Sequence, residues 1–117
     1  MGWIIVLLVV VFFVWRMMPT KGVDSISTEE LKGMLKDKSK QYLDVRTPGE
    51  YNGRHIKQFK NIPLNTLSAQ LGDIDKSKEV VVICQSGMRS AKAANMLKKS
   101  GYEKVTNVKD GMSAWRN

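Results

Sequence analysis

The most reactive side chain in this sequence is a single cysteine, Cys84, which lies between two segments of contrasting character. Residues 80–83 before it are all aliphatic, whereas residues 85–90 after it are polar or flexible and lead into an alanine-rich segment. This order predicts a strand, a loop and then a helix whose N-terminus lies near the thiol. Unpaired N–H groups and the positive end of the helix dipole favour an anion there. Cys84 is therefore predicted to act as a thiolate nucleophile.

The loop after Cys84 has the composition of an anion-binding nest. Gly87 reaches the backbone angles that turn N–H groups inward, and Arg89 adds a positive charge that can lower the thiol pKa. Two other interpretations stay open, in which Cys84 is a buried inert thiol and Arg89 is a surface or helix-capping residue. We expect Cys84 to be catalytic and six loop residues to bind substrate: Gln85, Ser86, Gly87, Met88, Arg89 and Ser90.

Strand and helix signals alternate through the rest of the chain. Strands are predicted over residues 42–45, 80–83 and 105–108, and residues 56–64 read as loop and extended chain. A capping box at residues 27–30 opens a helix that ends near residue 37, and further helices are predicted after residue 47, over 66–71, and after the loop at residues 85–90, ending at residue 101. Residues 111–115 read as a terminal turn. This order indicates an α/β fold with a mainly parallel sheet flanked by helices, with the functional crevice at the carboxyl ends of the strands.

Composition limits the kinds of partner and cofactor. The chain has 117 residues and a net charge of +8, and its basic surface suits anionic small molecules or lipid. Its lysines are scattered, and no nucleic-acid recognition motif accompanies them, so nucleic acid is not expected as a partner. One cysteine and one histidine make neither a disulfide nor a metal site. No metal and no other cofactor are expected.

The first 18 residues are predicted to form a transmembrane anchor that places a lipid bilayer among the partners, because residues 2–15 carry no charge and are apolar on every face. As a helix they span about 27 Å, slightly less than a hydrocarbon core of about 30 Å. Trp3 and Trp15 bracket the run as interfacial anchors do, and Pro19 ends it. A cleaved signal peptide is the alternative, but the basic region before the apolar run and the small-residue cleavage site after it are both missing.

The charges that flank the apolar run predict its orientation. Arg16 and Lys21 lie on its C-terminal side, which favours a single-pass membrane protein with its domain facing the cytoplasm. The predicted organisation is an anchor over residues 1–18, a linker over residues 19–25 and one α/β domain over residues 26–117.

Several separated motifs resemble the rhodanese family of sulfurtransferases, and the resemblance extends over residues 26–115. The motifs are Asp44-Val45-Arg46 followed by Glu50-Tyr51, His55-Ile56 followed by Asn61-Ile62-Pro63-Leu64, the loop at residues 84–90, and Gly111-Met112 followed by Trp115. Each is weak alone, but their order is specific. The sequence departs from the family at Arg54, at residues 57–60 and at Asp110, so the family's donor and partner preferences do not transfer directly.

The resemblance implies a small rhodanese-like domain that transfers sulfur. It implies that Cys84 takes sulfane sulfur from thiosulfate or a persulfide donor, becomes a persulfide, and passes the outer sulfur to a thiol, cyanide or a protein acceptor. The alternatives are a non-catalytic scaffold at the membrane and a thiol redox or phosphatase-like enzyme. The number of residues between Cys84 and Arg89 is one fewer than in cysteine phosphatases, which argues against phosphate.

Two other residues could contribute to the site. Arg46 either forms a local pair with Asp44 or faces the pocket and helps to hold an anionic donor. His55 invites a role as a general base or ligand, but a histidine without predicted partners is more often structural.

Overall fold

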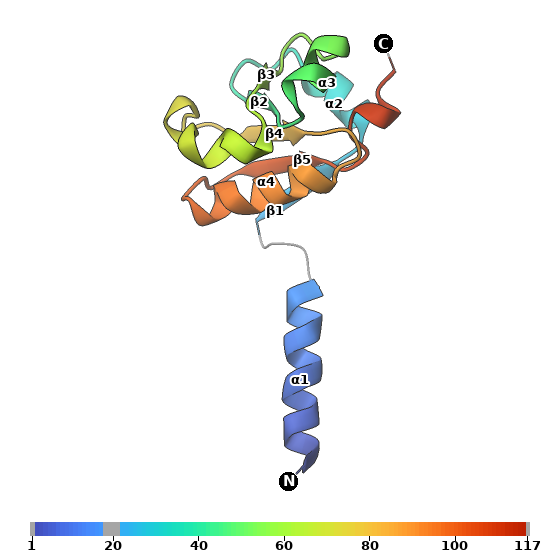
Figure 1. The fold of residues 1–117 in the computed structure, drawn as a ribbon, viewed down its shortest axis with the longest axis vertical. Helices are drawn as coiled ribbons and strands as arrows, with labels where there is room; N and C mark the ends of the chain where they lie inside the picture. The colour runs from blue at the N-terminus through green and yellow to red at the C-terminus, as the bar shows by residue number, and fades with distance from the viewer. Residues whose placement is uncertain (1, 18–21, 117) are drawn as a thin grey trace.

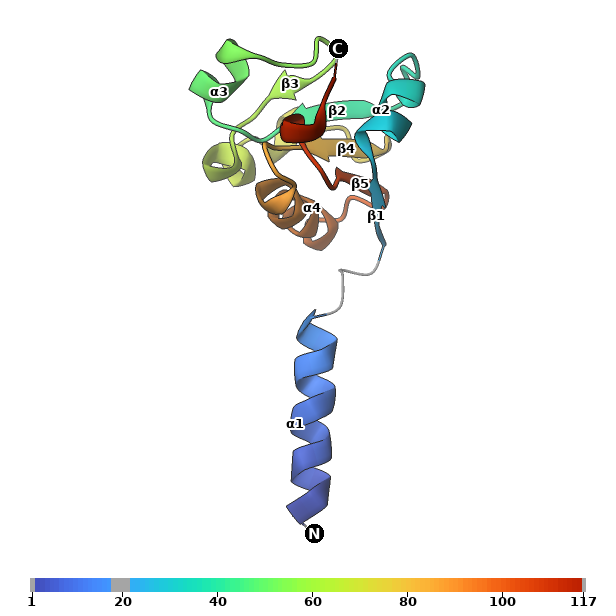
Figure 2. The same cartoon turned by 90° about the vertical axis from the view of Figure 1, so that its right-hand side faces the viewer.

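Five parallel strands form one sheet in the order β1-β5-β4-β2-β3 (Figures 1 and 2). The computed structural model describes residues 2–17 and 22–116, without the side chains of residues 13–17. The strands are β1 (Val23–Ile26), β2 (Gln41–Asp44), β3 (Lys60–Asn61), β4 (Val80–Ile83) and β5 (Val105–Val108). Both β4 and β5 have a strand on each side and are buried along their whole length, which agrees with the apolar composition of β4 and also buries the polar Thr106 and Asn107 of β5.

Four α-helices and three 3-10 helices accompany the sheet. The α-helices are α1 (Gly2–Met17), α2 (Thr28–Met34), α3 (Pro48–Gly53) and α4 (Met88–Lys99); the 3-10 helices are Leu64–Ala69, Leu71–Asp73 and Met112–Ala114. Capping boxes open both short helices, with Ser27 and Glu30 at α2 and Thr47 and Glu50 at α3.

Alternate side chains of the strands point into two apolar layers. Val80 and Val82 face the layer that contains Ala93, Ala94 and Leu97 of α4. On the other side, Val81 and Ile83 share a layer with Leu31, Phe59, Met112 and Trp115, which come from α2, the chain before β3, and the C-terminal turn. Because both faces of the sheet are covered, the carboxyl ends of its strands remain as the edge at which a site can open.

The structure corrects three details of the predicted elements. Residues 23–25 were assigned to the linker, but they belong to β1, which pairs with β5 along its whole length. Residues 60–61, within the predicted extended chain, form β3 beside β2. Where one helix was predicted over residues 66–71, two short 3-10 helices are found. Polar residues of β1 face solvent at the sheet edge, so its sequence lacks the apolar run that marks β4.

The N-terminal helix α1 stands apart from the sheet (Figure 1). The apolar side chains of residues 3–12 are 44% to 69% exposed. Among the described residues, no helix is both long enough and apolar enough to cross a bilayer. The transmembrane helix predicted over residues 1–18 is therefore not supported. The described helix has 16 residues, and at 1.5 Å per residue it spans about 24 Å. Residues 1 and 18 of the predicted anchor lie outside the described part of the chain.

Candidate active site

Cys84 is the first residue after β4 and is fully buried, at 0% exposure. The C-terminal turn holds the backbone of Cys84 and of the residue after it, because the N–H of Met112 donates to the Cys84 carbonyl at 2.8 Å and that of Ser113 donates to the Gln85 carbonyl at 2.9 Å. Figure 2 looks onto this end of the sheet and shows α3, the start of α4 and the C-terminal turn around it. The motif that includes α3, the cysteine loop and the C-terminal turn are far apart in sequence, and they meet at the carboxyl end of β4.

Gly87 lets the loop turn back toward the sulfur atom. Its φ is +93°, in the left-handed region that side chains disfavour. A Cβ at this position would lie 2.0 Å from the carbonyl oxygen of Lys109, so a larger residue clashes with backbone as well. In this conformation the Gly87 N–H donates to the Cys84 Sγ at 3.0 Å.

Hydrogen bonds to the Cys84 Sγ favour its thiolate form. The Ser90 hydroxyl donates to the sulfur at 3.3 Å, in addition to the Gly87 amide. Burial alone raises the thiol pKa, but the bonds from the Ser90 hydroxyl and from the backbone N–H groups of Ser90, Ser86 and Gly87 outweigh it, and the pKa is lowered below its ordinary value of 9.0. The site therefore combines a buried sulfur with a cradle of donors that stabilises negative charge on it.

Arg89 uses its guanidinium to join α4 to α3. Its two terminal nitrogens bond the two carboxylate oxygens of Glu50 at 2.7 and 2.9 Å, in a bidentate pair. The Arg89 guanidinium, with smaller contributions from Thr47, holds the pKa of Glu50 at about 2 against the opposing effect of burial. Glu50 in turn raises the pKa of Arg89, with a smaller contribution from Cys84. The lowered thiol pKa thus follows from loop and Ser90 hydrogen bonds, and the main partner of Arg89 is Glu50.

Arg46 is buried, at 2% exposure, and its guanidinium donors are directed at protein acceptors. Its Nε and Nη2 bond the carboxylate of Asp44, Nη1 donates to the Glu50 carbonyl and to Oε1 of Gln85, and Nη2 also donates to the Arg54 carbonyl. This geometry corresponds to the local Asp44 pair and not to a pocket residue that holds a donor. Arg46 instead supports the site by joining β2, α3 and the loop.

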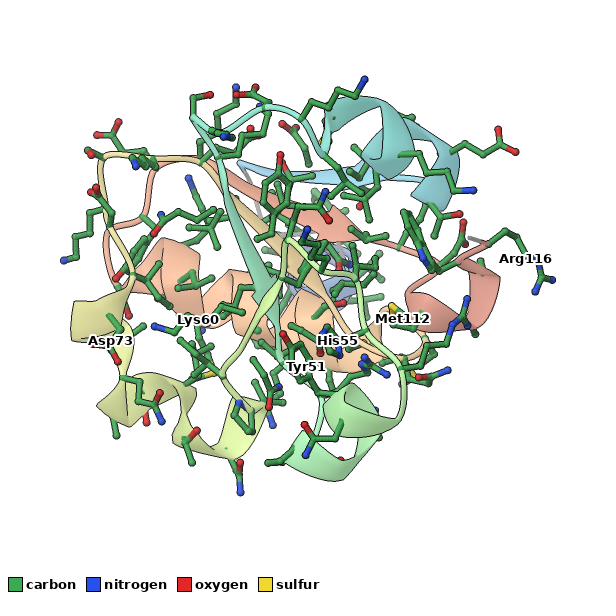
Figure 3. All side chains as sticks on the ribbon, turned by 90° about the horizontal axis from the view of Figure 1, so that it is seen from above. Tyr51, His55, Lys60, Asp73, Met112 and Arg116 are labelled. Atoms are coloured by element: carbon green, nitrogen blue, oxygen red, sulfur yellow. The ribbon has the colours of Figure 1, made fainter. Side chains whose placement is uncertain are left out.

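The remaining predicted residues lie at the surface of the loop. Gln85 and Ser86 are exposed, with the Ser86 N–H directed toward the sulfur. Met88 is 79% exposed at the first position of α4. His55 is exposed, and its ring stacks on Tyr51 with centroids 3.9 Å apart while Nδ1 lies 2.8 Å from the Tyr51 carbonyl oxygen (Figure 3). These contacts give His55 a structural position beside α3, which contains Tyr51.

Sequence reasoning missed two contributors to the site. Glu50 was noted only as part of a motif, yet it is the partner of Arg89, 39 positions away. Asn107 on β5 is buried beside the loop, where its Nδ2 lies 3.4 Å from the Gly87 carbonyl oxygen. Strand register alone places Asn107 opposite Val82, two residues before Cys84, so a correct β4–β5 pairing is the signal that would have found it.

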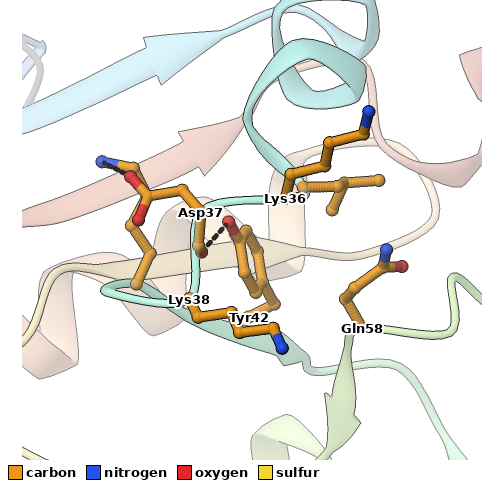
Figure 4. A pocket seen from close by; sticks show the side chains of 7 residues that line it. Lys36, Asp37, Lys38, Tyr42 and Gln58 are labelled. Carbon is orange, nitrogen blue, oxygen red and sulfur yellow. Dashed lines mark hydrogen bonds and ion pairs between the residues drawn. The ribbon is translucent and has the colours of Figure 1, made fainter.

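Two hollows flank the domain at opposite ends of the sheet. A cleft of about 560 Å³ opens beside the loop and is lined by Val45, Pro63, Leu64, Arg89, Lys92 and Met96, among others. Another, of about 520 Å³, lies near the start of β2 and is lined by lysines together with Asp37, Tyr42 and Gln58 (Figure 4). Within residues 2–17 and 22–116, no group of three metal-ligating side chains was found.

A parallel α/β sheet with a cysteine loop between the end of a central strand and a helix N-terminus defines a small α/β domain with a candidate thiolate site. The family model of the rhodanese-like domain matches residues 27–117. The chain belongs to the rhodanese-like domain family.

Relatives and solved structures extend this assignment. A sulfurtransferase of Allochromatium vinosum is 34% identical over 94 residues, which cover 80% of this chain and 88% of the relative. The thiosulfate sulfurtransferase GlpE of Shewanella oneidensis is 32% identical over 77% of this chain and 89% of its own length. The crystal structure of a rhodanese-like domain protein from Staphylococcus aureus superimposes with a TM-score of 0.74 at 37% identity, covering 80% of this chain and 92% of that one.

Some relatives are considerably longer than the matched region. The chain spans 51% of the length of YrkF and 60% of the length of YqhL, both from Bacillus subtilis, to which it is 38% and 40% identical. The shared part in these relatives is thus the rhodanese-like domain.

Proposed function

We propose that this protein is a sulfurtransferase that takes sulfane sulfur from thiosulfate or a persulfide donor onto Cys84 and passes it to a thiol, cyanide or a protein acceptor. The observation that carries the proposal is the cradle around Sγ, in which the Gly87 amide and the Ser90 hydroxyl donate to one buried sulfur. The names of the relatives from A. vinosum and S. oneidensis support the same chemistry.

The reaction begins with a thiolate whose charge the loop stabilises. The Cys84 thiolate attacks the outer sulfur of thiosulfate, the sulfur–sulfur bond of the donor breaks, and sulfite leaves with the bonding electrons. Cys84 then carries a persulfide, whose outer sulfur lies within the loop lined by inward-turned N–H groups. In the second half of the reaction an acceptor nucleophile attacks that outer sulfur and regenerates the Cys84 thiolate.

Intact-protein mass spectrometry tests this proposal directly. The full chain is incubated with thiosulfate, and separately with polysulfide, and is compared with Cys84→Ser. We expect a mass increase of one sulfur atom that cyanide or dithiothreitol reverses and that Cys84→Ser lacks. Circular dichroism of the variant controls for loss of fold. No increase with either donor would contradict the proposal and favour a non-catalytic scaffold.

Hydrolysis of an aryl phosphate or formation of a mixed disulfide without sulfur uptake would instead favour the phosphatase-like or redox alternatives. Both are measured on the same preparation. Because Cys84 is the single cysteine of the chain, the alkylated protein serves as the blank in each assay.

We also propose that residues 1–18 attach the protein to a lipid bilayer and that the domain faces the cytoplasm. The exposed apolar side chains of residues 3–12 support attachment, and Arg16 and Lys21 on the C-terminal side support the orientation. The test is alkaline extraction of membranes, followed by protease digestion of intact and of permeabilised cells. Release by alkaline carbonate would contradict attachment, and digestion in intact cells would contradict the orientation.

A further inference from the structure

Met88 is exposed where apolar side chains are otherwise covered. It is 79% exposed, and within residues 22–116 it is the one large apolar residue that is exposed to solvent. It lies four positions after Cys84 and opens α4, so it projects from the loop that surrounds the sulfur. A methionine is flexible and polarisable, and an exposed one at a site entrance suits contact with a partner surface.

Within residues 22–116, basic residues without a carboxylate partner lie near the loop that contains Met88. Lys92 lies one helical turn further along α4, on the same side of the helix as Met88. Lys109 adjoins the loop, because its carbonyl oxygen lies against Gly87. The Arg54 carbonyl accepts from the Arg46 guanidinium, which also donates to Gln85, and the Arg54 guanidinium donates to the Trp115 carbonyl at 2.6 Å. Lys92, Lys109 and Arg54 are exposed, and among the described residues none of them has a carboxylate partner.

The buried sulfur restricts how an acceptor reaches it. Cys84 has no exposed surface and belongs to one of the two apolar layers of the core, so an acceptor approaches from the side of the loop, where Met88 is exposed. We propose that Met88, Lys92, Lys109 and Arg54 form a docking surface for an acidic protein segment that presents the thiol acceptor of sulfur. This inference rests on the sulfurtransferase function proposed above and names the class of its acceptor.

The observations favour a protein segment over a small anion or a membrane. A small anion is held by charge and gains nothing from an exposed apolar side chain. A membrane surface would meet the same charges, but it supplies no nucleophile to the sulfur within the loop. An acidic segment around a cysteine combines all three needs: apolar contact, opposite charge and a thiol.

The transfer step is balanced without another reactant. The acceptor thiolate attacks the outer sulfur of the Cys84 persulfide, and a new sulfur–sulfur bond forms on the acceptor. The bond between the Cys84 Sγ and the outer sulfur breaks, and its electron pair returns to Sγ as thiolate. The proton of the persulfide stays on the transferred sulfur, so no oxidant or reductant is consumed.

Two synthetic cysteine peptides of equal length serve as probes, one with glutamates and one with lysines around the cysteine. The full chain is first loaded with sulfur, and the loading is verified by mass. The single-turnover transfer rate is then measured for each peptide and divided by the thiolate concentration from the measured thiol pKa of the peptide. We expect the acidic peptide to react about tenfold faster at an ionic strength of about 0.01 M and the difference to disappear at about 1 M.

A matched pair of double variants separates local charge from net charge. The double variant Lys92→Glu with Lys109→Glu changes the proposed surface, whereas Lys36→Glu with Lys38→Glu makes the same charge change near the start of β2, by the hollow in Figure 4. The first pair is expected to abolish or invert the preference for the acidic peptide, and the second to retain most of it. Equal loss in both pairs, or no preference in the unaltered chain, would overturn the proposal.

Met88 is tested with a polar and an apolar replacement. Each transfer rate is divided by the rate of the same variant with cyanide, which removes changes in the loop itself. Met88→Ser is expected to slow transfer to the acidic peptide several-fold, and Met88→Leu to retain it; equal effects would exclude an apolar contact.

Binding to lipid vesicles tests the alternative that this surface contacts a membrane. If the Met88 and Lys92/Lys109 variants lose binding to anionic phospholipid vesicles while the peptide preference is unchanged, the surface contacts lipid and the inference is wrong. If Cys84 cannot be loaded with sulfur at all, both the proposed function and this inference fail. A loaded protein without charge preference contradicts only this inference.

Discussion

Cys84 has no exposed surface, and yet the pKa of its thiol is lowered, because donors compensate for the loss of water. Burial raises the pKa of a thiol, whereas bonds to the thiolate lower it. Here one hydroxyl and three backbone N–H groups act on a single sulfur. Glycine at position 87 is needed to direct one of these amides inward. At the scale of residues, reactivity therefore depends on the loop around the sulfur more than on the cysteine alone.

Replacement of Ser90 tests the side-chain contribution to this pKa. In Ser90→Ala the thiolate loses the hydroxyl bond, so we expect the pKa of Cys84 to rise and alkylation at neutral pH to slow. Ser86→Ala is the matched control, because Ser86 acts on the sulfur through its backbone N–H. The measurement is the rate of alkylation against pH for both variants. An unchanged pKa in Ser90→Ala would contradict the role of the hydroxyl.

At the scale of elements, the site is assembled where β4, α4, α3 and the C-terminal turn meet. The Arg89–Glu50 pair joins α4 to α3, and Glu50 also caps α3 through Thr47. Arg46 extends the network to β2 through Asp44. The loop is thus fixed from three sides by polar contacts, while the C-terminal turn holds its backbone.

Gly87→Ala tests the close approach of the loop to β5. The left-handed backbone and the clash with the Lys109 carbonyl predict a loss of more than about 2 kcal/mol in the free energy of unfolding. Gly33→Ala in α2, where a Cβ meets nothing within 4 Å, should be neutral or stabilising by up to about 1 kcal/mol. Chemical denaturation measures both. Similar stability of the two variants would show that the loop adapts.

The Arg89–Glu50 pair predicts how the free energy of unfolding depends on pH in the acid range. The pKa of Glu50 is about 2 in the folded chain and 4.5 ordinarily, so its stabilising contribution is complete above about pH 4.5 and is lost as the pH falls toward 2. Glu50→Gln should weaken the fall in unfolding free energy over this range. Glu103→Gln is the control, because Glu103 makes no ion pair among the described residues. Equal acid dependence in both variants would contradict a role for the pair.

At the scale of the whole molecule, the sheet and its two covering layers form the folding unit, and α1 stands outside it. The side chains of residues 3–12 remain exposed, so they add nothing to the domain core. The domain begins at β1, which fills the edge of the sheet beside β5.

Deletion of residues 1–21 is therefore expected to change the free energy of unfolding of the domain by less than about 0.5 kcal/mol. The same deletion should abolish binding to lipid vesicles if α1 attaches the protein to membranes. Deletion of residues 1–26, which removes β1 as well, is the contrasting variant and should destabilise the domain. Denaturation and vesicle sedimentation measure the two effects. Strong destabilisation by the shorter deletion would mean that α1 contributes to the fold.

Local composition was sufficient to predict the central elements and the position of the thiol among them. The apolar run of β4, the alanine-rich α4, the capping box that opens α2 and the polar loop after Cys84 each have a physical signature within a few residues. Such signatures do not depend on residues that are far away in sequence. The family assignment likewise followed from motifs in their order along the chain.

Tertiary structure decided the features that depend on partners far apart in sequence. The polar segment of β1 is a strand because β5 lies beside it, and Arg89 binds Glu50 because α3 and α4 meet at one end of the sheet. Arg46 is buried because five acceptors converge around its guanidinium. Side-chain direction depends on these long-range contacts, whereas strand, loop and helix signals are local. The sequence by itself therefore determined that the thiol lies between a strand and a helix, and only the fold decided which groups surround it.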